Sequence, residues 1–143
     1  MTSNMGLIKG NNFTDDRGTV HFVNDFSMES VVRLYEISPK DTSIIRAWQA
    51  HKEECKWFYC TKGSFKVNVV KIDDFDNPSE DLTVNSFELN ASHPEVLFIP
   101  GGYANGFKAI SENSKLMVFS NFGLDASKQD DYRYDTNKWI KNW

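Results

Sequence analysis

Gln49 and His51 lie two residues apart in the segment 46–51, Arg-Ala-Trp-Gln-Ala-His. On a β-strand, side chains at this spacing point to the same face. If that face borders a cavity, a neutral imidazole there can take a proton from carbon next to a ketone, because the ordinary pKa of histidine is about 6.5. Gln49 cannot do so, since an amide does not titrate. The spacing equally allows a buried histidine that is satisfied by a neighbour.

Removal of such a proton leaves an enolate, whose oxygen needs a positive or hydrogen-bonding partner. Lys56 follows His51 closely and can supply a positive charge, while Gln49 and Tyr35 can donate hydrogen bonds. Tyr35 is also a candidate proton donor at the opposite face of the substrate. The plain alternatives are an exposed strand charge for Lys56 and a core ring with its hydroxyl at the rim for Tyr35.

Short β-strands must position these residues. Apolar residues recur mostly at every second position, in short runs separated by turn residues, and clear amphipathic helices are absent before residue 120. This pattern predicts many short strands at regular spacing, which indicates a barrel or a sandwich. The expected strands are 19–24, 31–37, 43–50, 56–61, 65–72, 82–89, 96–99, 106–110 and 115–121. We expect helical turns only within 126–143.

Composition narrows the class of protein. The chain has 143 residues, which fits a single domain over 1–143, and its formal net charge of -4 argues against a protein that coats nucleic acid. The sequence shows no charged N-terminal segment followed by an apolar run, so we expect no signal peptide. No apolar stretch is long enough to span a membrane. Cys55 and Cys60 lie at odd spacing, so they should face opposite sides of a strand and form no disulfide, as in cytoplasmic proteins.

Two longer segments carry a family resemblance. Segment 45–51, continued through 56–63, and segment 98–107, Phe-Ile-Pro-Gly-Gly-Tyr-Ala-Asn-Gly-Phe, resemble the two conserved blocks of cupins. More narrowly, they are similar to the RmlC-like dTDP-4-dehydrorhamnose 3,5-epimerases. Asp16-Arg17-Gly18 and Tyr132-Arg133-Tyr134-Asp135 resemble the N-terminal and C-terminal blocks of that family. Arg33-Leu34-Tyr35, placed before segment 46–51, resembles the FdtA/WxcM-like dTDP-sugar 3,4-ketoisomerases instead.

The resemblance implies a fold and an assembly. It implies an all-β cupin, an RmlC-like jelly-roll antiparallel β-barrel, with a short helical or irregular C-terminal segment. Both related families are dimers, so it also implies a homodimer. The reaction needs no cofactor, because the ketone already acidifies the neighbouring carbon.

The same resemblance assigns roles to residues. Arg17 and Arg46 match the arginines that hold a pyrophosphate, to which a planar guanidinium is well suited; a salt bridge is the alternative for Arg46. Lys56 matches the family lysine. The implied catalytic residues are His51, Tyr35 and Lys56, and the implied substrate-binding residues are Arg17, Arg33, Arg46, Gln49, Tyr103 and Asn105.

Departures from the epimerase pattern matter as much as the matches. Gln49 replaces the histidine that is the general base, the strand 116–119 lacks the opposing tyrosine, and Asn105 replaces the histidine of the second block. Metal-dependent cupins use more histidines than this chain offers near His51, so we expect no catalytic metal. A metal-dependent cupin oxygenase is therefore disfavoured.

Two functions remain in competition. The first is an isomerase or epimerase that acts on a dTDP-4-keto-6-deoxyhexose in deoxysugar or surface polysaccharide biosynthesis, with the nucleotide sugar as its partner. The second is a non-catalytic cupin that binds a sugar nucleotide or a protein. The sequence leaves the choice between epimerisation and 3,4-keto migration open.

Overall fold

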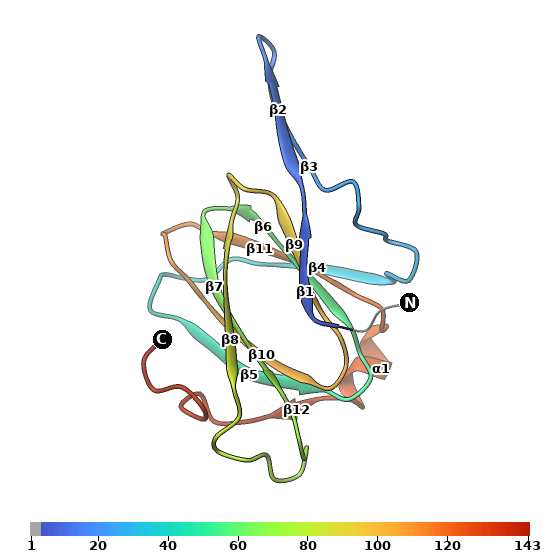
Figure 1. Ribbon diagram of the computed structural model, residues 1–143, viewed down its shortest axis with the longest axis vertical. Coiled ribbons are helices and arrows are strands. Elements are labelled where there is room, and N and C mark those ends of the chain that lie inside the picture. The colour runs from blue at the N-terminus through green and yellow to red at the C-terminus, as the bar shows by residue number, and fades with distance from the viewer. Residues whose placement is uncertain (1–3) are drawn as a thin grey trace.

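The computed structural model describes residues 4–143, and two antiparallel sheets that face each other make up most of it (Figure 1). The five strands of the first sheet are, in spatial order, β1 (Gly6–Lys9), β9 (Glu95–Ile99), β6 (Lys56–Lys62), β11 (Lys115–Ser120) and β4 (Arg33–Ile37). Those of the second are β12 (Tyr132–Arg133), β5 (Ile45–His51), β10 (Tyr103–Ala109), β7 (Ser64–Lys71) and β8 (Val84–Asn90). The expected all-β fold is confirmed.

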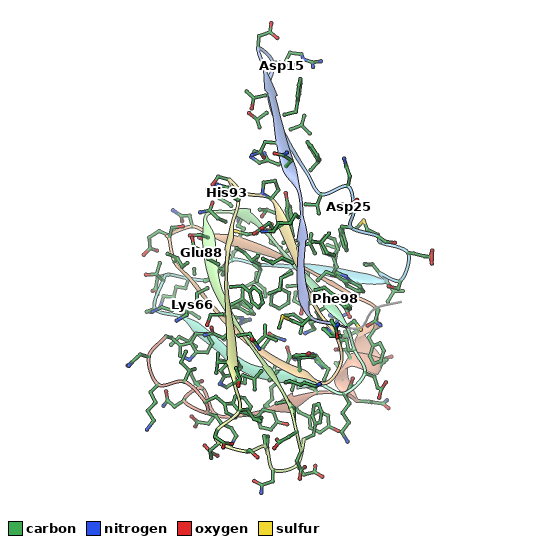
Figure 2. The ribbon with its side chains drawn as sticks, in the orientation of Figure 1. Asp15, Asp25, Lys66, Glu88, His93 and Phe98 are labelled. Carbon is green, nitrogen blue, oxygen red and sulfur yellow. The ribbon has the colours of Figure 1, made fainter. Side chains whose placement is uncertain are left out.

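Two further elements complete the fold. Strands β2 (Asn11–Asp15) and β3 (Gly18–Phe22) form a hairpin that projects from the body of the molecule, with Asp15 at its tip (Figure 2). The helix α1 (Leu124–Lys128) follows β11 and leads to β12. It is the short helical segment that the resemblance implies near the C-terminus.

Apolar side chains from both sheets meet between them. The main core cluster contains Phe58, Leu97 and Leu116 of the first sheet and Phe65, Val67 and Phe107 of the second. The alternation of buried and less buried residues along β11 follows the strand period of two. This packing fixes the inner faces of β4, β5, β6 and β10, which carry the polar residues described below.

A second cluster lies on the outer side of β5. The Trp48 ring packs against Trp139 and Trp143 of the C-terminal segment, with ring centroids 5.1 and 5.3 Å apart. Its indole N–H donates to the carbonyl of Lys138 at 2.9 Å. The C-terminal segment is thereby held along β5, and β12 pairs with that strand through Arg133 and Gln49.

The pairing of β5 with β10 is interrupted by a register shift between Asn105 and Phe107. The Gly106 backbone passes so close to Ala47 that a Cβ at Gly106 would lie 2.6 Å from the Ala47 Cβ. Residues three apart on a regular strand face opposite sides. The irregularity lets both Arg46 and Gln49 border one cavity.

The structure also contains strands that the pattern of apolar residues did not predict, namely β1, β2 and β12. Most of β2 is exposed and polar, and β12 has two residues, so neither carries an alternating apolar signal. Strand β10 begins at Tyr103 and includes Gly106, where the sequence predicted a start at 106. Within residues 4–143, no helix has the length and apolar character needed to cross a membrane.

Candidate active site

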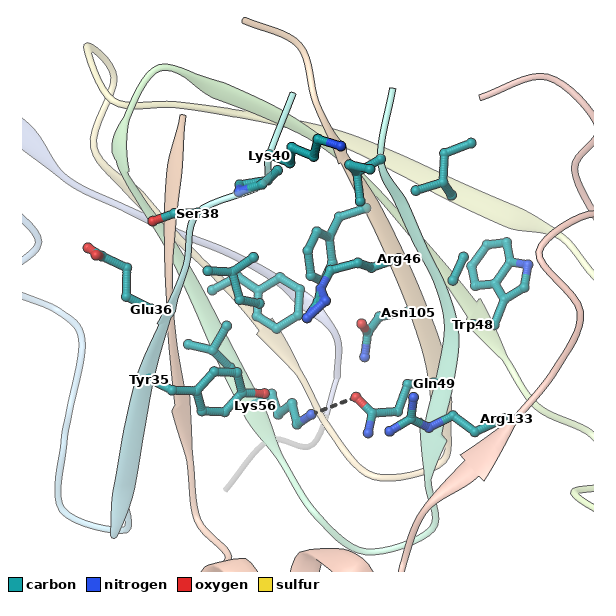
Figure 3. A pocket seen from close by; sticks show the side chains of 18 of the residues that line it. Tyr35, Glu36, Ser38, Lys40, Arg46, Trp48, Gln49, Lys56, Asn105 and Arg133 are labelled. Atoms are coloured by element: carbon teal, nitrogen blue, oxygen red, sulfur yellow. Dashed lines mark hydrogen bonds between the residues drawn. The ribbon is translucent and has the colours of Figure 1, made fainter. Parts of the chain in front are cut away.

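A cavity of about 810 Å³ lies between the inner faces of the two sheets (Figure 3). Strands β4 and β6 of the first sheet and β5 and β10 of the second contribute to its wall. Its main polar and charged lining residues are Tyr35, Glu36, Lys40, Arg46, Gln49, Lys56, Asn105 and Arg133. The apolar part of the wall includes Phe58, Phe107 and Val118. The space suits a ligand with both polar and apolar parts.

A chain of hydrogen bonds crosses one end of this cavity. The Lys56 ammonium donates to the Gln49 side-chain oxygen at 3.1 Å, and the Gln49 side-chain nitrogen donates to an Asp131 carboxylate oxygen at 3.1 Å. Arg133 donates to the same carboxylate oxygen at 2.7 Å. Asp131 thus fixes Gln49 and Arg133 together, and it orients Lys56 through Gln49.

Burial changes the acid–base properties of the groups on this wall. Desolvation is the main cause that lowers the pKa of Lys56 from 10.5 to about 8, with neighbouring Arg33 acting in the same direction. Burial likewise raises the pKa of Tyr35, although nearby Arg33 opposes the change. Burial alone would raise the pKa of Asp131, but hydrogen bonds from Arg133 and Gln49 hold it below its ordinary value. Lys56 therefore loses its charge at a lower pH than an exposed lysine does.

Four polar side chains on the cavity wall have no hydrogen-bond partner among residues 4–143. The Tyr35 hydroxyl, the Asn105 amide, the Arg46 guanidinium and the Lys40 ammonium form no hydrogen bond or ion pair with the described part of the chain. The side chain of Arg46 extends into the cavity, where Figure 3 shows it between the two walls. Arg46 and Lys40 are exposed, so these groups have no protein partner to give up when a polar ligand binds.

The His51 ring is buried and held through one of its nitrogens. Its Nδ1 lies 2.5 Å from the backbone oxygen of Asp130, and Nε2 has no hydrogen-bond partner among the described residues. Burial lowers the pKa of His51, and the positive charge of Lys56 adds to that effect. Since a carbonyl oxygen can only accept, the proton sits on Nδ1 and the lone pair sits on Nε2. The second ring nitrogen, Nε2, is thus buried and carries a lone pair without a partner among residues 4–143.

Five of the predicted site residues lie together on the cavity wall. They are Tyr35, Arg46, Gln49, Lys56 and Asn105. Lys56 is buried, so it is not the exposed strand charge that was the alternative. Arg46 forms no salt bridge with the described residues, so the structure does not show the salt bridge that was the alternative role for this residue.

The other four predicted residues lie elsewhere. His51 shares the inner face of β5 with Gln49 but does not itself line the cavity. Arg33 donates to buried Glu54 at 3.1 Å, and Tyr103 packs against the main core cluster. Arg17 lies at the turn of the β2–β3 hairpin, where its side chain is 83% exposed and pairs with Asp15 (Figure 1).

Sequence reasoning did not assign a site role to Arg133 or Lys40, which also line the cavity. Arg133 stands in a block that resembles the family, but its approach to the cavity depends on the two-residue strand β12 beside β5. Lys40 follows β4 in a loop that has no motif. Among residues 4–143, no three His, Cys, Asp or Glu side chains come together in a group that could hold a metal ion.

Comparison with known proteins agrees with the fold. The model of the family described as FdtA: WxcM-like, C-terminal, matches residues 3–143. The probable low-salt glycan biosynthesis epimerase Agl13 of Haloferax volcanii is 29% identical over 120 residues, which cover 76% of each chain.

Solved structures with the same fold include two sugar-nucleotide enzymes. The QdtA 3,4-ketoisomerase of Thermoanaerobacterium thermosaccharolyticum, solved in complex with TDP, is 24% identical to this chain, and the two structures superpose with a TM-score of 0.71. The match covers 98% of this chain and 94% of the ketoisomerase chain. The dTDP-4-dehydrorhamnose 3,5-epimerase of Bacillus anthracis, with TDP and PPi bound, has a TM-score of 0.76, 18% identity, and coverage of 94% and 80%. These similarities confirm the RmlC-like cupin jelly-roll that the sequence indicates.

Proposed function

Because the chain belongs to the family described as FdtA: WxcM-like, C-terminal, we propose that it isomerises or epimerises a dTDP-linked 4-keto-6-deoxyhexose. The observation that carries the proposal is the cavity with unpartnered donors, Arg46 and Lys40 among them, beside a lysine of lowered pKa. The activity would serve deoxysugar and surface polysaccharide biosynthesis, including lipopolysaccharide.

Arg46 is the main candidate for the diphosphate. Its guanidinium reaches into the cavity without an acidic partner among the described residues, and its planar fork matches two phosphate oxygens. Lys40 and Arg133 add positive charge to the same wall. The polar end of the cavity, with Gln49, Lys56 and Asn105, is then left for the keto sugar.

The proton chemistry would begin at His51. Its Nε2 lone pair takes the proton from the sugar carbon next to the ketone. The C–H electron pair then forms a double bond to the carbonyl carbon, and the carbonyl oxygen becomes the negative oxygen of an enolate. The Lys56 ammonium stabilises the negative oxygen, and Gln49 holds that ammonium in place at 3.1 Å. His51 is buried next to this wall, so small rearrangements must bring the substrate to Nε2.

The product depends on where the proton returns. Return to C4 from the same side, with the hydroxyl proton of C3 passing to the C4 oxygen, moves the ketone from C4 to C3. Return to C3 from the opposite side inverts that carbon. Tyr35 stands on the wall opposite β5 and forms no hydrogen bond within the described chain, so it is the candidate donor for inversion.

A homodimer would cover apolar surface that this chain leaves open. Tyr35 faces the cavity, so Leu34 next to it faces outward, where it is 59% exposed. Phe119 and Trp57 lie next to Leu34 on this face, but Phe26 of the same chain packs against both rings, so Leu34 is the exposed part of the row. Phe13 of the projecting hairpin is 58% exposed as well. We further propose a cytoplasmic location, which the free thiols of the chain favour.

In such a dimer, the hairpin of one copy would lie against its partner. Arg17 at the hairpin turn is remote from the cavity of its own chain (Figure 1). If Arg17 contacts a phosphate group, that group is therefore bound in the cavity of the partner copy. The dimer thus gives Arg17 the role that the resemblance implies. Among residues 4–143, its side chain forms an ion pair with Asp15 alone.

Product analysis tests the proposal. Purified protein is incubated with dTDP-4-keto-6-deoxyglucose, and the sugar is followed by proton NMR. A 3-keto product identifies keto migration, and an inverted C3 or C5 identifies epimerisation. Unchanged sugar together with tight dTDP binding would reject the enzyme and leave the non-catalytic cupin, which the loss of the epimerase histidine at Gln49 favours.

A further inference from the structure

Glu54 is a buried carboxylate surrounded by donors. Its side chain is 0% exposed, and it accepts hydrogen bonds from Arg33 at 3.1 Å, from Ser120 at 2.5 Å and from Ser127 at 2.7 Å. A carboxylate that accepts from three donors is satisfied in its ionised form. Three donors also offset the cost of burying the charge.

The remaining neighbour of this anion is the His51 ring. Glu54 Oε1 lies 3.4 Å from His51 Nδ1, the nitrogen that also meets the backbone oxygen of Asp130 at 2.5 Å. Both neighbours of Nδ1 are acceptors, so both favour a proton on that nitrogen. Nε2 on the far side of the ring is buried and has no partner among the described residues.

We propose that Glu54 is a positioning residue that holds His51 in the tautomer with a free Nε2 and stabilises the imidazolium formed when His51 takes the substrate proton. The proposal rests on the assignment of His51 as the base in the proposed function. Glu54 acts through His51 and touches neither the cavity nor the substrate. Arg33 and the two serines hold Glu54 in place through hydrogen bonds, and this contact occupies Arg33, which the resemblance had assigned to the substrate.

Other charges near the ring do not replace Glu54. The Asp130 carboxylate accepts three backbone N–H groups, from Lys52, Glu53 and Glu54, and so holds the turn between β5 and β6. Asp131 acts from the same segment as Asp130 and is already paired with Arg133. On β6, Lys56 opposes an imidazolium. Glu54 is therefore the anion whose removal most weakens protonation of His51.

The first test compares Glu54→Gln with Glu53→Gln. Glu53 is an exposed neighbour, so its substitution removes the same charge outside the buried cluster. The ¹⁵N and ¹H NMR signals of His51 are titrated in both variants, with His21 and His93 as internal references. In Glu54→Gln we expect a lower pKa of His51 and a mixed tautomer. We also expect kcat to fall by about tenfold or more with KM nearly unchanged, and the acid limb of kcat/KM to move to lower pH.

Ser127→Ala supplies a second test with the opposite sign. Ser127 donates to Oε1, the same oxygen that faces His51. Removal of this donor leaves more charge on Oε1 for the imidazolium, so the pKa of His51 should rise. A residue that serves only to stabilise the fold would not shift the titration of His51 in opposite directions in the two variants. If Glu54→Gln does not fold, Ser127→Ala alone decides through the same NMR titration.

The outcomes separate this inference from the proposed function. Loss of turnover in His51→Asn, together with an unchanged pKa, tautomer and kcat in Glu54→Gln, would overturn the role of Glu54 and leave His51 as the base. Full turnover in His51→Asn would reject the proposed base itself. An unchanged or lowered pKa of His51 in Ser127→Ala would also contradict the positioning role.

Discussion

The Lys56 ammonium donates to the Gln49 side-chain oxygen at 3.1 Å, across the wall of a cavity between two sheets. An amide side chain does not titrate, so Gln49 cannot supply a base. The contact instead fixes a buried cation beside the space for the sugar. In the proposed reaction, Gln49 supports the charge that stabilises the enolate, and another group takes the proton.

Replacement of Lys56 by Met should remove most of the enolate stabilisation. Loss of one such donor costs about a hundredfold or more in kcat, and Met keeps the length of the apolar stem. Because the pKa of Lys56 is about 8, wild-type activity should also fall as the pH rises above that value. Steady-state kinetics between pH 6 and about 9.5 checks both effects. A Lys56→Met variant with wild-type kcat would contradict the role.

The same lysine affects stability with a defined sign. Its pKa is lower in the folded chain than the ordinary 10.5, so the unfolded chain binds more protons between about 8 and 10.5. The free-energy cost of burying the charged ammonium is therefore fully present below pH 8, and it decreases as the pH rises from about 8 to 10.5. Chemical denaturation should show that wild type gains stability relative to Lys56→Met between pH 8 and 10. A constant difference would show that Lys56 is not desolvated.

Arg46→Ala should weaken dTDP binding. A charge-assisted contact to phosphate contributes about 1.5–3 kcal/mol, so we expect Kd to increase by roughly tenfold to a hundredfold. Calorimetric titration at low and high salt measures it, and the loss should shrink as salt increases. Lys62→Ala on the exposed end of β6 is the control for removing one positive charge. Equal affinities for the two variants would remove Arg46 from the binding site.

Leu34→Asp should dissociate the proposed homodimer. The substitution places a charge in the apolar row on the outer face of the first sheet, where a partner copy would have to bury it. Leu124→Asp on α1 alters a leucine of similar exposure, 56% against 59%, away from that sheet. Sedimentation velocity should give a monomer for the first variant and a dimer for the second. A wild-type monomer would reject the assembly.

Gly106→Ala should destabilise the fold at the irregular pairing of β5 and β10. The new Cβ would lie 2.6 Å from Ala47 Cβ and 2.7 Å from the Trp143 ring, so the backbone must shift at a cost of about 1–3 kcal/mol. Gly6→Ala, which meets nothing within 4 Å, is the matched control. Thermal unfolding should give a lower Tm for the first variant alone. Equal Tm values would show that the region absorbs the added methyl.

Much of the fold was predictable because alternating apolar residues mark strands. The run from Lys56 to Lys62 and the run from Lys115 to Ser120 were predicted almost at their true bounds, since the first is a short apolar run and the second alternates with buried residues. Strand β2 was missed because an exposed hairpin arm needs no apolar alternation. Five of the residues expected at the site do line the cavity; four of them lie in or at the start of strands that were predicted, whereas Asn105 lies before the predicted start of β10 and was found through the resemblance.

The rest of the site depends on contacts between distant segments. Arg133 reaches the cavity because Trp48 holds the C-terminal segment along β5, and no local pattern shows such packing. Glu54 looked like one of several acidic residues after His51, and its burial depends on Ser120 and Ser127 far along the chain. Arg17 was assigned by resemblance, and it lies at the exposed turn of the β2–β3 hairpin, where it pairs with Asp15.

Solvent deuterium exchange tests the central claim most directly. Wild type and His51→Asn are incubated in D₂O with dTDP-4-keto-6-deoxyglucose, and the label at C3 and C5 is followed by NMR and mass spectrometry. With His51 as the base, wild type should incorporate deuterium next to the ketone, and His51→Asn should lose at least about a hundredfold in that rate. Equal rates in the two proteins would contradict His51 as the base, and no label in wild type would contradict proton abstraction altogether.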